Sequence, residues 1–389
     1  MTIPQRIQDF AEDLTAIRRD FHEHPELGFE EVRTAGIVAE KLRSWGIEVH
    51  EGIGKTGVVG VLHGQRPGRR IGLRADMDAL PIDEQTNLPW ASKTPGVMHA
   101  CGHDAHTTML LGAARYLAET RDFAGTAIFI FQPAEEGLGG GRAMIADGLF
   151  DRFPCDEIYG MHNSPYHPPG EIGVKPGPAM AGANFFDIKV TAKGCHAAMP
   201  ESGIDAVVIA SELVGQLQSI VSRNVPATKP IVLSVTQIHA GAAYNVIPEV
   251  ATLAGTVRYF DRAVAEMVTA RMQALCDGLA QGYGVQIELE MRNVFDVLEN
   301  DATLSQAMIV EAQALVGEKA QLKTDLVMGS EDFADMLQVV PGAYCTVGHA
   351  GTVPLHNPGF VLDDAMLPLG ATLMARMVEA RGAAMAGGA

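Results

Sequence analysis

The segment HACGHDAH, residues 99–106, places three histidines, a cysteine and an aspartate close together. Cys101 and His103 are one residue apart, so in extended backbone both side chains point to the same side, as two ligands of one metal ion require. A thiolate with an imidazole suits zinc or a neighbouring transition metal. Two ligands do not make a site. A nucleophilic cysteine, a disulfide or an ordinary polar turn would also account for this segment alone.

A pair of adjacent carboxylates, Glu135 and Glu136, follows the apolar run TAIFIF. Adjacent carboxylates repel each other unless a cation lies nearby or one is protonated. Consecutive extended residues point in opposite directions, so one carboxylate can bind a metal while the other holds a water beside it. A solvated acidic turn is the alternative. The position after a predicted strand favours a site, because open α/β sheets bind ligands at the carboxyl ends of their strands.

Two more histidines stand at comparable places. His162, in YGMHN, ends a predicted strand, and His356, in PLHNP, lies in a loop near the carboxyl end. Each histidine alone is more readily structural than metal-binding. Clusters of ligand-type residues at three successive strand ends together predict a metal centre.

The elements that must position these residues alternate between strands and helices. This order predicts an α/β domain whose central, mostly parallel sheet has helices on both faces. The strands are expected over 57–64, 70–76, 126–132 and 156–163, and the helices over 3–21, 30–45 and 104–120.

At 389 residues the chain is long for one core, so two domains are expected. Residues 184–293 read as strand, helix, two strands, helix and strand, the βαββαβ order of ferredoxin-like domains. A Pro/Gly/Ala-rich connector over 175–184 precedes them, and the α/β pattern resumes near 301. We therefore predict a catalytic domain formed by 1–180 and 296–389, with an inserted α+β domain over 184–293.

Composition excludes several classes of function. The chain carries 47 acidic against 29 basic residues, a net charge of −18, which disfavours binding to nucleic acids or anionic membranes. No apolar run is long enough to span a bilayer. The beginning, MTIPQRIQDFAEDL, lacks the apolar core of a signal peptide, so we expect a cytoplasmic protein.

Neither a disulfide framework nor a nucleotide site is expected. The five cysteines are odd in number and widely spaced, which argues against a disulfide framework. GIGKTG, residues 52–57, resembles a phosphate-binding loop, but Val49 stands where that motif needs glycine. We predict a turn between strands there.

Nine motifs, taken in order, make the chain recognisable. It resembles the aminoacylase/carboxypeptidase-G-type metallopeptidases, and most closely their amidohydrolase subfamily of hippurate hydrolases, N-acyl-amino-acid amidohydrolases and auxin-conjugate hydrolases. The motifs are RADMDALP (74–81), HACGHDAH (99–106), QPAEEG (132–137), GMHN (160–163), GCHAAMP (194–200), NVIPE (245–249), GTVR (255–258), MGSEDF (328–333) and PLHNPGF (354–360).

The resemblance implies a site for two divalent metal ions, zinc or manganese, with cobalt or nickel as further candidates. Its ligands would be Cys101, His103, Glu136, His162 and His356, with the Cys101 thiolate shared between the ions. Glu135 would be the general base. The wider family has a metal-binding histidine where this chain has Asp76, which is therefore left out of the ligand set. Asp78 would orient a ligand from outside that set.

The resemblance gives the inserted domain two tasks, as a lid and as a dimerisation domain. His196 would donate a hydrogen bond to the developing oxyanion, in its own or in a partner subunit's site. Asn245 and Arg258 would hold the substrate carboxylate, for which the planar guanidinium of arginine is well suited. A homodimer or homotetramer formed through this domain is expected.

The resulting hypothesis is a metal-dependent hydrolase that cleaves the amide of N-acyl-L-amino acids, hippurate-like or N-acetylated. A dipeptidase or carboxypeptidase of the same family is the alternative within this chemistry. A metal-independent hydrolase with Cys101 as nucleophile is a second alternative, although it would not require the pair Glu135-Glu136. A purely structural metal site is a third, but such sites are usually closed by four cysteine or histidine ligands.

Overall fold

The computed structural model describes residues 2–349 and 351–383, which divide into two compact units. The large unit consists of the chain up to Gly177, the segment Glu299–Asp325 and the chain from Asp332 onward. The small unit consists of Pro178–Leu298 and the short segment Leu326–Glu331. Each unit has its own hydrophobic core, so each is described separately.

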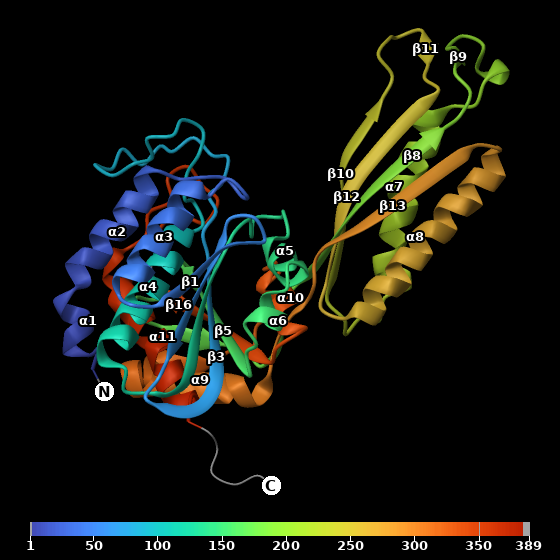
Figure 1. The fold of residues 1–389 in the computed structure, drawn as a ribbon. Helices are drawn as coiled ribbons and strands as arrows, with labels where there is room; N and C mark the ends of the chain where they lie inside the picture. Colours follow the sequence, from blue (N-terminus) through green and yellow to red (C-terminus); the bar gives the residue numbers. More distant parts are fainter. Residues whose placement is uncertain (1, 350, 384–389) are drawn as a thin grey trace. The chain divides into compact units, whose positions relative to one another are not determined.

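The large unit is built on an eight-stranded sheet (Figure 1). Its four central strands are parallel to one another, which confirms the predicted, mostly parallel α/β sheet. In spatial order the strands are β1 (Glu48–Ile53), β2 (Gly57–His63), β4 (Ala124–Gln132), β3 (Arg66–Asp76), β5 (Glu157–Ser164), β16 (Gly342–Gly348), β6 (Ile172–Val174) and β15 (Ala320–Leu322).

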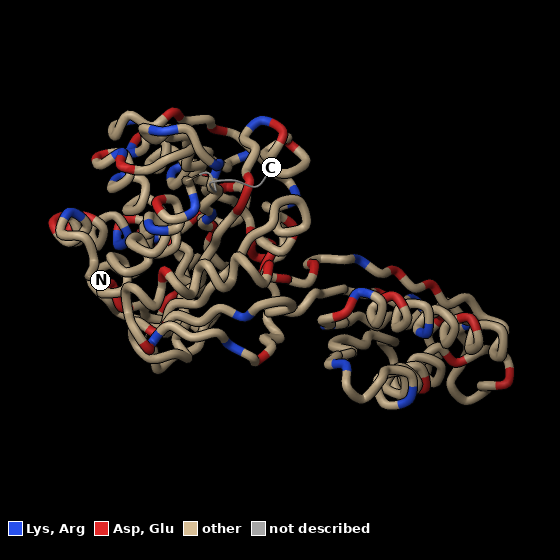
Figure 2. The backbone as a smooth tube through the Cα atoms, turned by 90° about the horizontal axis from the view of Figure 1, so that it is seen from below, with Lys and Arg blue, Asp and Glu red and all other residues tan. Residues whose placement is uncertain are grey.

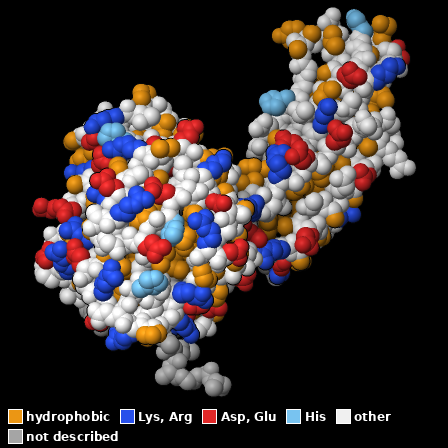
Figure 3. Space-filling view, viewed as in Figure 1, with side chains coloured by type: hydrophobic (Ala, Val, Ile, Leu, Met, Phe, Trp, Pro, Cys, Tyr) orange, Lys and Arg blue, Asp and Glu red, His pale blue; other side chains and the backbone are white. Residues whose placement is uncertain are grey.

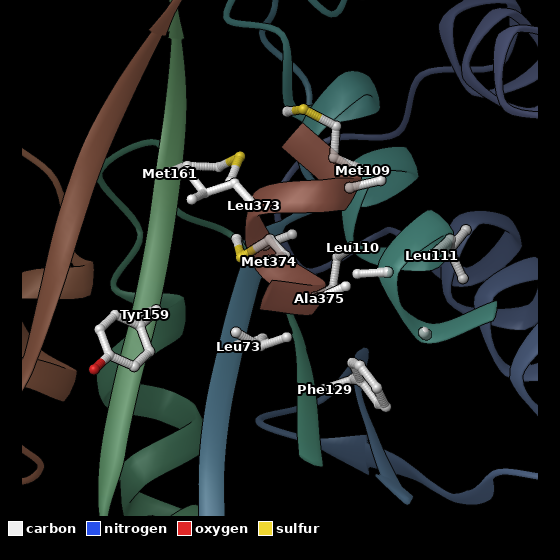
Figure 4. Packing of buried hydrophobic residues seen from close by; sticks show 14 of the residues in the cluster. Leu73, Met109, Leu110, Leu111, Phe129, Tyr159, Met161, Leu373, Met374 and Ala375 are labelled. Carbon is white, nitrogen blue, oxygen red and sulfur yellow. The ribbon is translucent and has the colours of Figure 1, made fainter. Parts of the chain in front are cut away.

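The central strands are almost continuously apolar because both of their faces are buried. Along β4, Phe129 and Phe131 belong to the main hydrophobic cluster, whereas Ile128 and Ile130 alternate with them and are buried outside it. Figure 4 shows the main cluster, where side chains of the sheet meet those of two helices. These are α4 (His103–Thr120) and α11 (Leu367–Arg381).

The other elements of the large unit complete these layers. Helix α2 packs on α4, and α5 packs against both β4 and α10. The remaining elements are α1 (Gln5–Asp9), α2 (Ala11–Glu23), α3 (Val32–Ser44), α5 (Gly140–Ala146), α6 (Leu149–Arg152), α9 (Ala302–Val316) and α10 (Phe333–Leu337).

The small unit has the predicted ferredoxin-like βαββαβ order. Its antiparallel sheet carries the two helices α7 and α8 side by side on one face (Figure 1). In spatial order the sheet consists of β10 (Ile231–Ala240), β12 (Val250–Tyr259), β8 (Gly182–Thr191) and β13 (Gln286–Phe295), and the helices are α7 (Ala206–Arg223) and α8 (Arg262–Tyr283). A two-stranded ribbon of β9 (Cys195–His196) and β11 (Val246–Ile247) is added to it.

Two local expectations need correction. The predicted connector over 175–184 instead contains β7 (Gly177–Met180) and the start of β8, because its small residues pack closely: Ala181 and Ala183 are fully buried. Strand β1 was not expected, since its EVHEGI sequence carries little apolar side chain. The GIGKTG segment forms the turn between β1 and β2, as predicted.

Charged residues of both signs are interspersed along both units (Figure 2). The visible face of the large unit likewise mixes them (Figure 3). Among the described helices, none combines the length and apolar character needed to cross a bilayer.

Candidate metal centre

The predicted ligand residues of the large unit follow the carboxyl ends of its parallel strands. Asp78 comes after β3, Glu135 and Glu136 come after β4, and His162 lies near the end of β5. Parallel strands end at the same edge of a sheet, so these side chains converge there. The loop before α4 supplies Cys101 to the same edge.

The structure brings together all five residues predicted to bind metal. Two groups of three share Cys101, and within each group the candidate ligand atoms lie within 4.8 Å of one another. The groups are Cys101, His103 and His162, and Cys101, Glu136 and His356. A thiolate common to two such groups is the arrangement that two neighbouring metal ions require.

Each of the two imidazoles turns one ring nitrogen toward this centre. The Nδ1 of His103 donates to the main-chain oxygen of Asp78 at 2.9 Å, and its buried Nε2 has no hydrogen-bond partner among the described residues. The Nδ1 of His162 donates to the main-chain oxygen of Asn163 at 2.6 Å, leaving Nε2 3.3 Å from the Cys101 sulfur. A hydrogen bond on one nitrogen fixes the tautomer in which the other can bind metal. The residues therefore fit a divalent transition metal.

Burial controls the protonation of the centre. It raises the pKa of the Cys101 thiol to about 12, and the carboxylate of Glu136 adds to this shift. Burial, together with the neighbouring His106, holds the pKa of His162 well below its usual range, so this imidazole is neutral. A thiol with so high a pKa is not ionised at neutral pH unless a metal binds it. This opposes the alternative in which Cys101 is a metal-free nucleophile.

The two glutamates occupy different surroundings. Glu136 is half-buried; its main-chain N–H donates to Asp78 Oδ2 at 2.9 Å, and its Oε1 lies 3.1 Å from His356 Nε2. Glu135 is buried, and its Oε1 accepts a hydrogen bond from the main-chain N–H of Asp332 at 3.3 Å. One oxygen of each carboxylate also lies within 4.8 Å of a ring nitrogen of His103. Glu135 is therefore next to the two groups that share Cys101 but belongs to neither of them.

A buried network that the sequence did not indicate surrounds these residues. Asp76 accepts a hydrogen bond from His106 Nδ1 at 2.6 Å and pairs with Arg74 Nη1 at 2.7 Å. The Nε2 of His106 accepts from the main-chain N–H of Asn163 at 3.0 Å. Asp76 also forms another close group with His103 and His106, so its omission from the ligand set stays a prediction. In the sequence, the network was indicated only by the presence of these charged and polar residues within the motifs.

The backbone of the centre is tightly constrained at Gly102. This residue has a φ of 92°, and an added Cβ would lie 2.2 Å from Asn163 Nδ2, so only glycine fits. His356 also has a positive φ, 60°, which is unusual for a residue with a side chain. Its main-chain N–H donates to Ala100 oxygen at 2.9 Å, which ties the two ligand loops together.

The remaining predicted site residues belong to the small unit. His196 is exposed on β9 and pairs with Val246, and the main-chain oxygen of Asn245 accepts from Ala197 at 2.9 Å. His196 and Asn245 are therefore neighbours, beyond the Thr191 end of the sheet.

Arg258 does not join that pair. It lies opposite Ala183 on β8, eight residues along β12 from the pair Val250–Thr191, a distance of roughly 26 Å at the usual rise per residue. Its Nη1 donates to Ser330 Oγ at 2.5 Å. Ser330 Oγ in turn donates to the main-chain oxygen of Ala181 at 2.7 Å.

Comparison with known proteins agrees with this centre. The model of peptidase family M20/M25/M40 matches residues 72–380. The chain is 42% identical to hippurate hydrolase of Campylobacter jejuni, over 97% of this chain and 98% of that protein. It is 41% identical to N-acetylcysteine deacetylase of Bacillus subtilis, over 94% and 95% of the two chains.

A solved structure extends the similarity to the whole fold. It is the YXEP protein of Bacillus subtilis, described as a dinuclear metal binding peptidase of the M20 family. That protein is 38% identical, with a TM-score of 0.85 and coverage of 96% of this chain and 98% of that one. The resemblance inferred from the nine motifs is thereby confirmed: the chain belongs to peptidase family M20/M25/M40, within its amidohydrolase group.

Proposed function

We propose that this protein is a metal-dependent amidohydrolase that cleaves N-acyl-L-amino acids into a carboxylic acid and a free amino acid. The observation that carries the proposal is the pair of ligand groups sharing Cys101, with the Glu135 carboxylate beside them. The names of the relatives support the substrate class, because hippurate and N-acetylcysteine are both N-acyl amino acids.

The metal would be held by Cys101, His103, Glu136, His162 and His356, as two divalent ions, zinc or manganese. When bound, such ions supply the Lewis acidity that lowers the pKa of a water to about 7 and polarises a carbonyl. Glu135 accepts the proton of the attacking water. It then returns that proton to the departing amine nitrogen, which completes hydrolysis of the amide.

The substrate would be gripped by the small unit. We assign His196 to the developing oxyanion, and Asn245 and Arg258 to the substrate carboxylate. The distance along β12 opposes contact of one small substrate with both His196 and Arg258 of the same chain. Arg258 lies roughly 26 Å along the strand from Val250, and His196 lies beyond that end of the sheet.

A homodimer resolves this separation, with His196 serving the site of the partner subunit. The end of the small unit that carries β9 and β11 exposes Met199, Tyr244 and Val246, and Figure 3 shows apolar side chains there. Exposed apolar side chains gathered at one end are typical of an interaction surface.

The testing experiment is elemental analysis of metal per chain, combined with hydrolysis assays. The substrates are hippurate, a panel of N-acetyl amino acids and a set of dipeptides, each tested before and after chelation. We expect bound transition metal and release of free amino acid that stops on chelation and returns with added metal. A metal-free protein that still hydrolyses hippurate would shift the chemistry to Cys101, and faster dipeptide cleavage would establish the peptidase alternative. Bound metal without turnover of any substrate would refute the proposal.

A further inference from the structure

We infer that Asp332, in the MGSEDF motif, is a positioning residue for Glu135, acting through an anchored main-chain N–H. The inference rests on the proposed function, in which Glu135 is the general base. It also assigns a role to a motif that sequence reasoning left without one.

Three buried donors bind the Asp332 carboxylate, one oxygen of which also lies within 4.8 Å of the carboxylates of Glu135 and Glu331. Its Oδ1 accepts from Gln132 Nε2 at 2.7 Å and from Arg74 Nη2 at 3.0 Å. Its Oδ2 accepts from the main-chain N–H of Gly141 at 2.9 Å. Asp332 has no exposed surface. A carboxylate bound in this way by three donors has one orientation, and its own backbone is fixed with it.

The anchored backbone reaches the base directly. The main-chain N–H of Asp332 donates to Glu135 Oε1 at 3.3 Å. Gln132, which binds the Asp332 side chain, is the last residue of β4 and stands three residues before Glu135. The contacts form a ring: the Gln132 side chain binds the Asp332 carboxylate, the Asp332 main-chain N–H binds the Glu135 carboxylate, and the chain from Gln132 to Glu135 closes it.

One buried guanidinium links this ring to the metal side of the centre. Arg74 donates from Nε to Gln132 Oε1 at 2.8 Å and from Nη2 to Asp332, and its Nη1 pairs with Asp76 at 2.7 Å. Asp76 in turn orients His106. Arg74 thus binds both Asp332, which positions Glu135, and Asp76, which orients His106. One side chain therefore fixes these two parts of the centre relative to each other. The fixed fork of arginine allows this, whereas a lysine at this position would not.

A merely structural ion pair between Arg74 and Asp332 makes a different prediction. It would affect stability and leave the chemistry of the folded protein unchanged. A positioning role must lower kcat of the folded, metal-loaded enzyme with little change in KM, because the geometry of the base is disturbed. The split between kcat and KM therefore separates the two roles.

The test uses Asp332→Asn in the metal-loaded enzyme. An asparagine amide would turn its NH₂ group toward at least one of the three donors and release the anchor. We expect kcat on hippurate to fall by about 10- to 100-fold, while KM and metal content stay near wild type.

The matched control is Asp335→Asn. Asp335 lies in the adjoining helix, is also buried, and pairs with Arg142 at 2.9 Å. This variant should keep the wild-type kcat and KM. If Asp332→Asn does not fold, Gln132→Met removes one of the three donors at similar length and carries the same test.

A double-mutant cycle completes the design. In the Glu135→Gln background Asp332→Asn should add almost no further loss, because the group it positions is already disabled. Equal losses in both backgrounds, or a folded Asp332→Asn enzyme with unchanged kcat, would overturn the inference. Full activity of Glu135→Gln alone would instead overturn the proposed function.

Discussion

Asp78 and His103 are joined by a contact of 3.1 Å between Oδ1 and Nδ1, which acts together with the Asp78 main-chain oxygen to direct His103 Nε2. The other oxygen of Asp78 accepts from the main-chain N–H of Glu136 at 2.9 Å. One buried carboxylate therefore positions two candidate ligands that lie 33 residues apart in the sequence.

Replacing Asp78 with asparagine should weaken metal binding by about 10- to 100-fold, because at least one of these contacts is lost. The measurement is competition for metal with a chromophoric chelator. Asp83→Asn is the control, since Asp83 is exposed and binds only Gly96 among the contacts described. Equal metal affinity of Asp78→Asn and wild type would show that Asp78 does not orient the ligands.

Glu135→Gln and Glu136→Gln differ by one position and should fail in different ways. Glu135→Gln is expected to retain its metal and lose about 10²- to 10⁴-fold in kcat, because it removes the proton acceptor. Glu136→Gln is expected to lose metal, because it removes a ligand. Elemental analysis and hippurate turnover of both proteins check this, with the exposed Glu30→Gln as control. Loss of metal in both variants would contradict the division of roles.

Mixing two inactive variants tests the proposed exchange of His196 between subunits. If His196 serves the partner subunit, a heterodimer of Glu135→Gln and His196→Ala chains contains one intact site. Random reassociation should then restore about a quarter of wild-type activity. Hydrolysis is measured before and after the two proteins are unfolded and refolded together. No recovery, with dimers present by light scattering, would place His196 in its own site.

Stability should decrease at acid pH because of His349. This residue is 4% exposed, and burial lowers its pKa from 6.5 to about 4. Between these values the unfolded chain binds a proton that the folded chain does not, so the free energy of unfolding falls as the pH decreases. One pKa unit corresponds to about 1.4 kcal/mol, so the loss approaches about 3 kcal/mol.

His349→Gln removes this titrating group. Urea unfolding of both proteins between neutral pH and about pH 4 should show a smaller decrease for the variant. The comparison between the two proteins cancels the contribution of metal release, which both share. Parallel pH dependences would exclude His349 as a source of acid sensitivity.

The fold was largely predictable because its strands and helices differ in period. The strand TAIFIF is buried on both faces and the helices α2 and α3 are amphipathic, so each carries a strong local signal. Strand β1 and the start of β8 were missed because edge position and small side chains produce no such signal. There, pairing with a neighbouring strand overrides local preference.

The candidate ligands were predictable from residue type and from their places at strand ends. The supporting contacts of Arg74 and Asp332 were not, since these residues are 258 positions apart and their pairing depends on the assembled sheet. The separation of His196 from Arg258 could not be predicted either, because it depends on which residues of neighbouring strands pair with each other. That pairing cannot be inferred from residue types or from spacing along the chain.

The candidate ligands lie between positions 101 and 356, and they meet only where the parallel strands end. Such strands pair late in folding, because long loops must close before their contacts form. The unfolded chain offers a metal ion little beyond the local pair Cys101 and His103. We therefore expect metal capture to follow folding. Bound ions would stabilise only the folded chain and would slow its inactivation by heat.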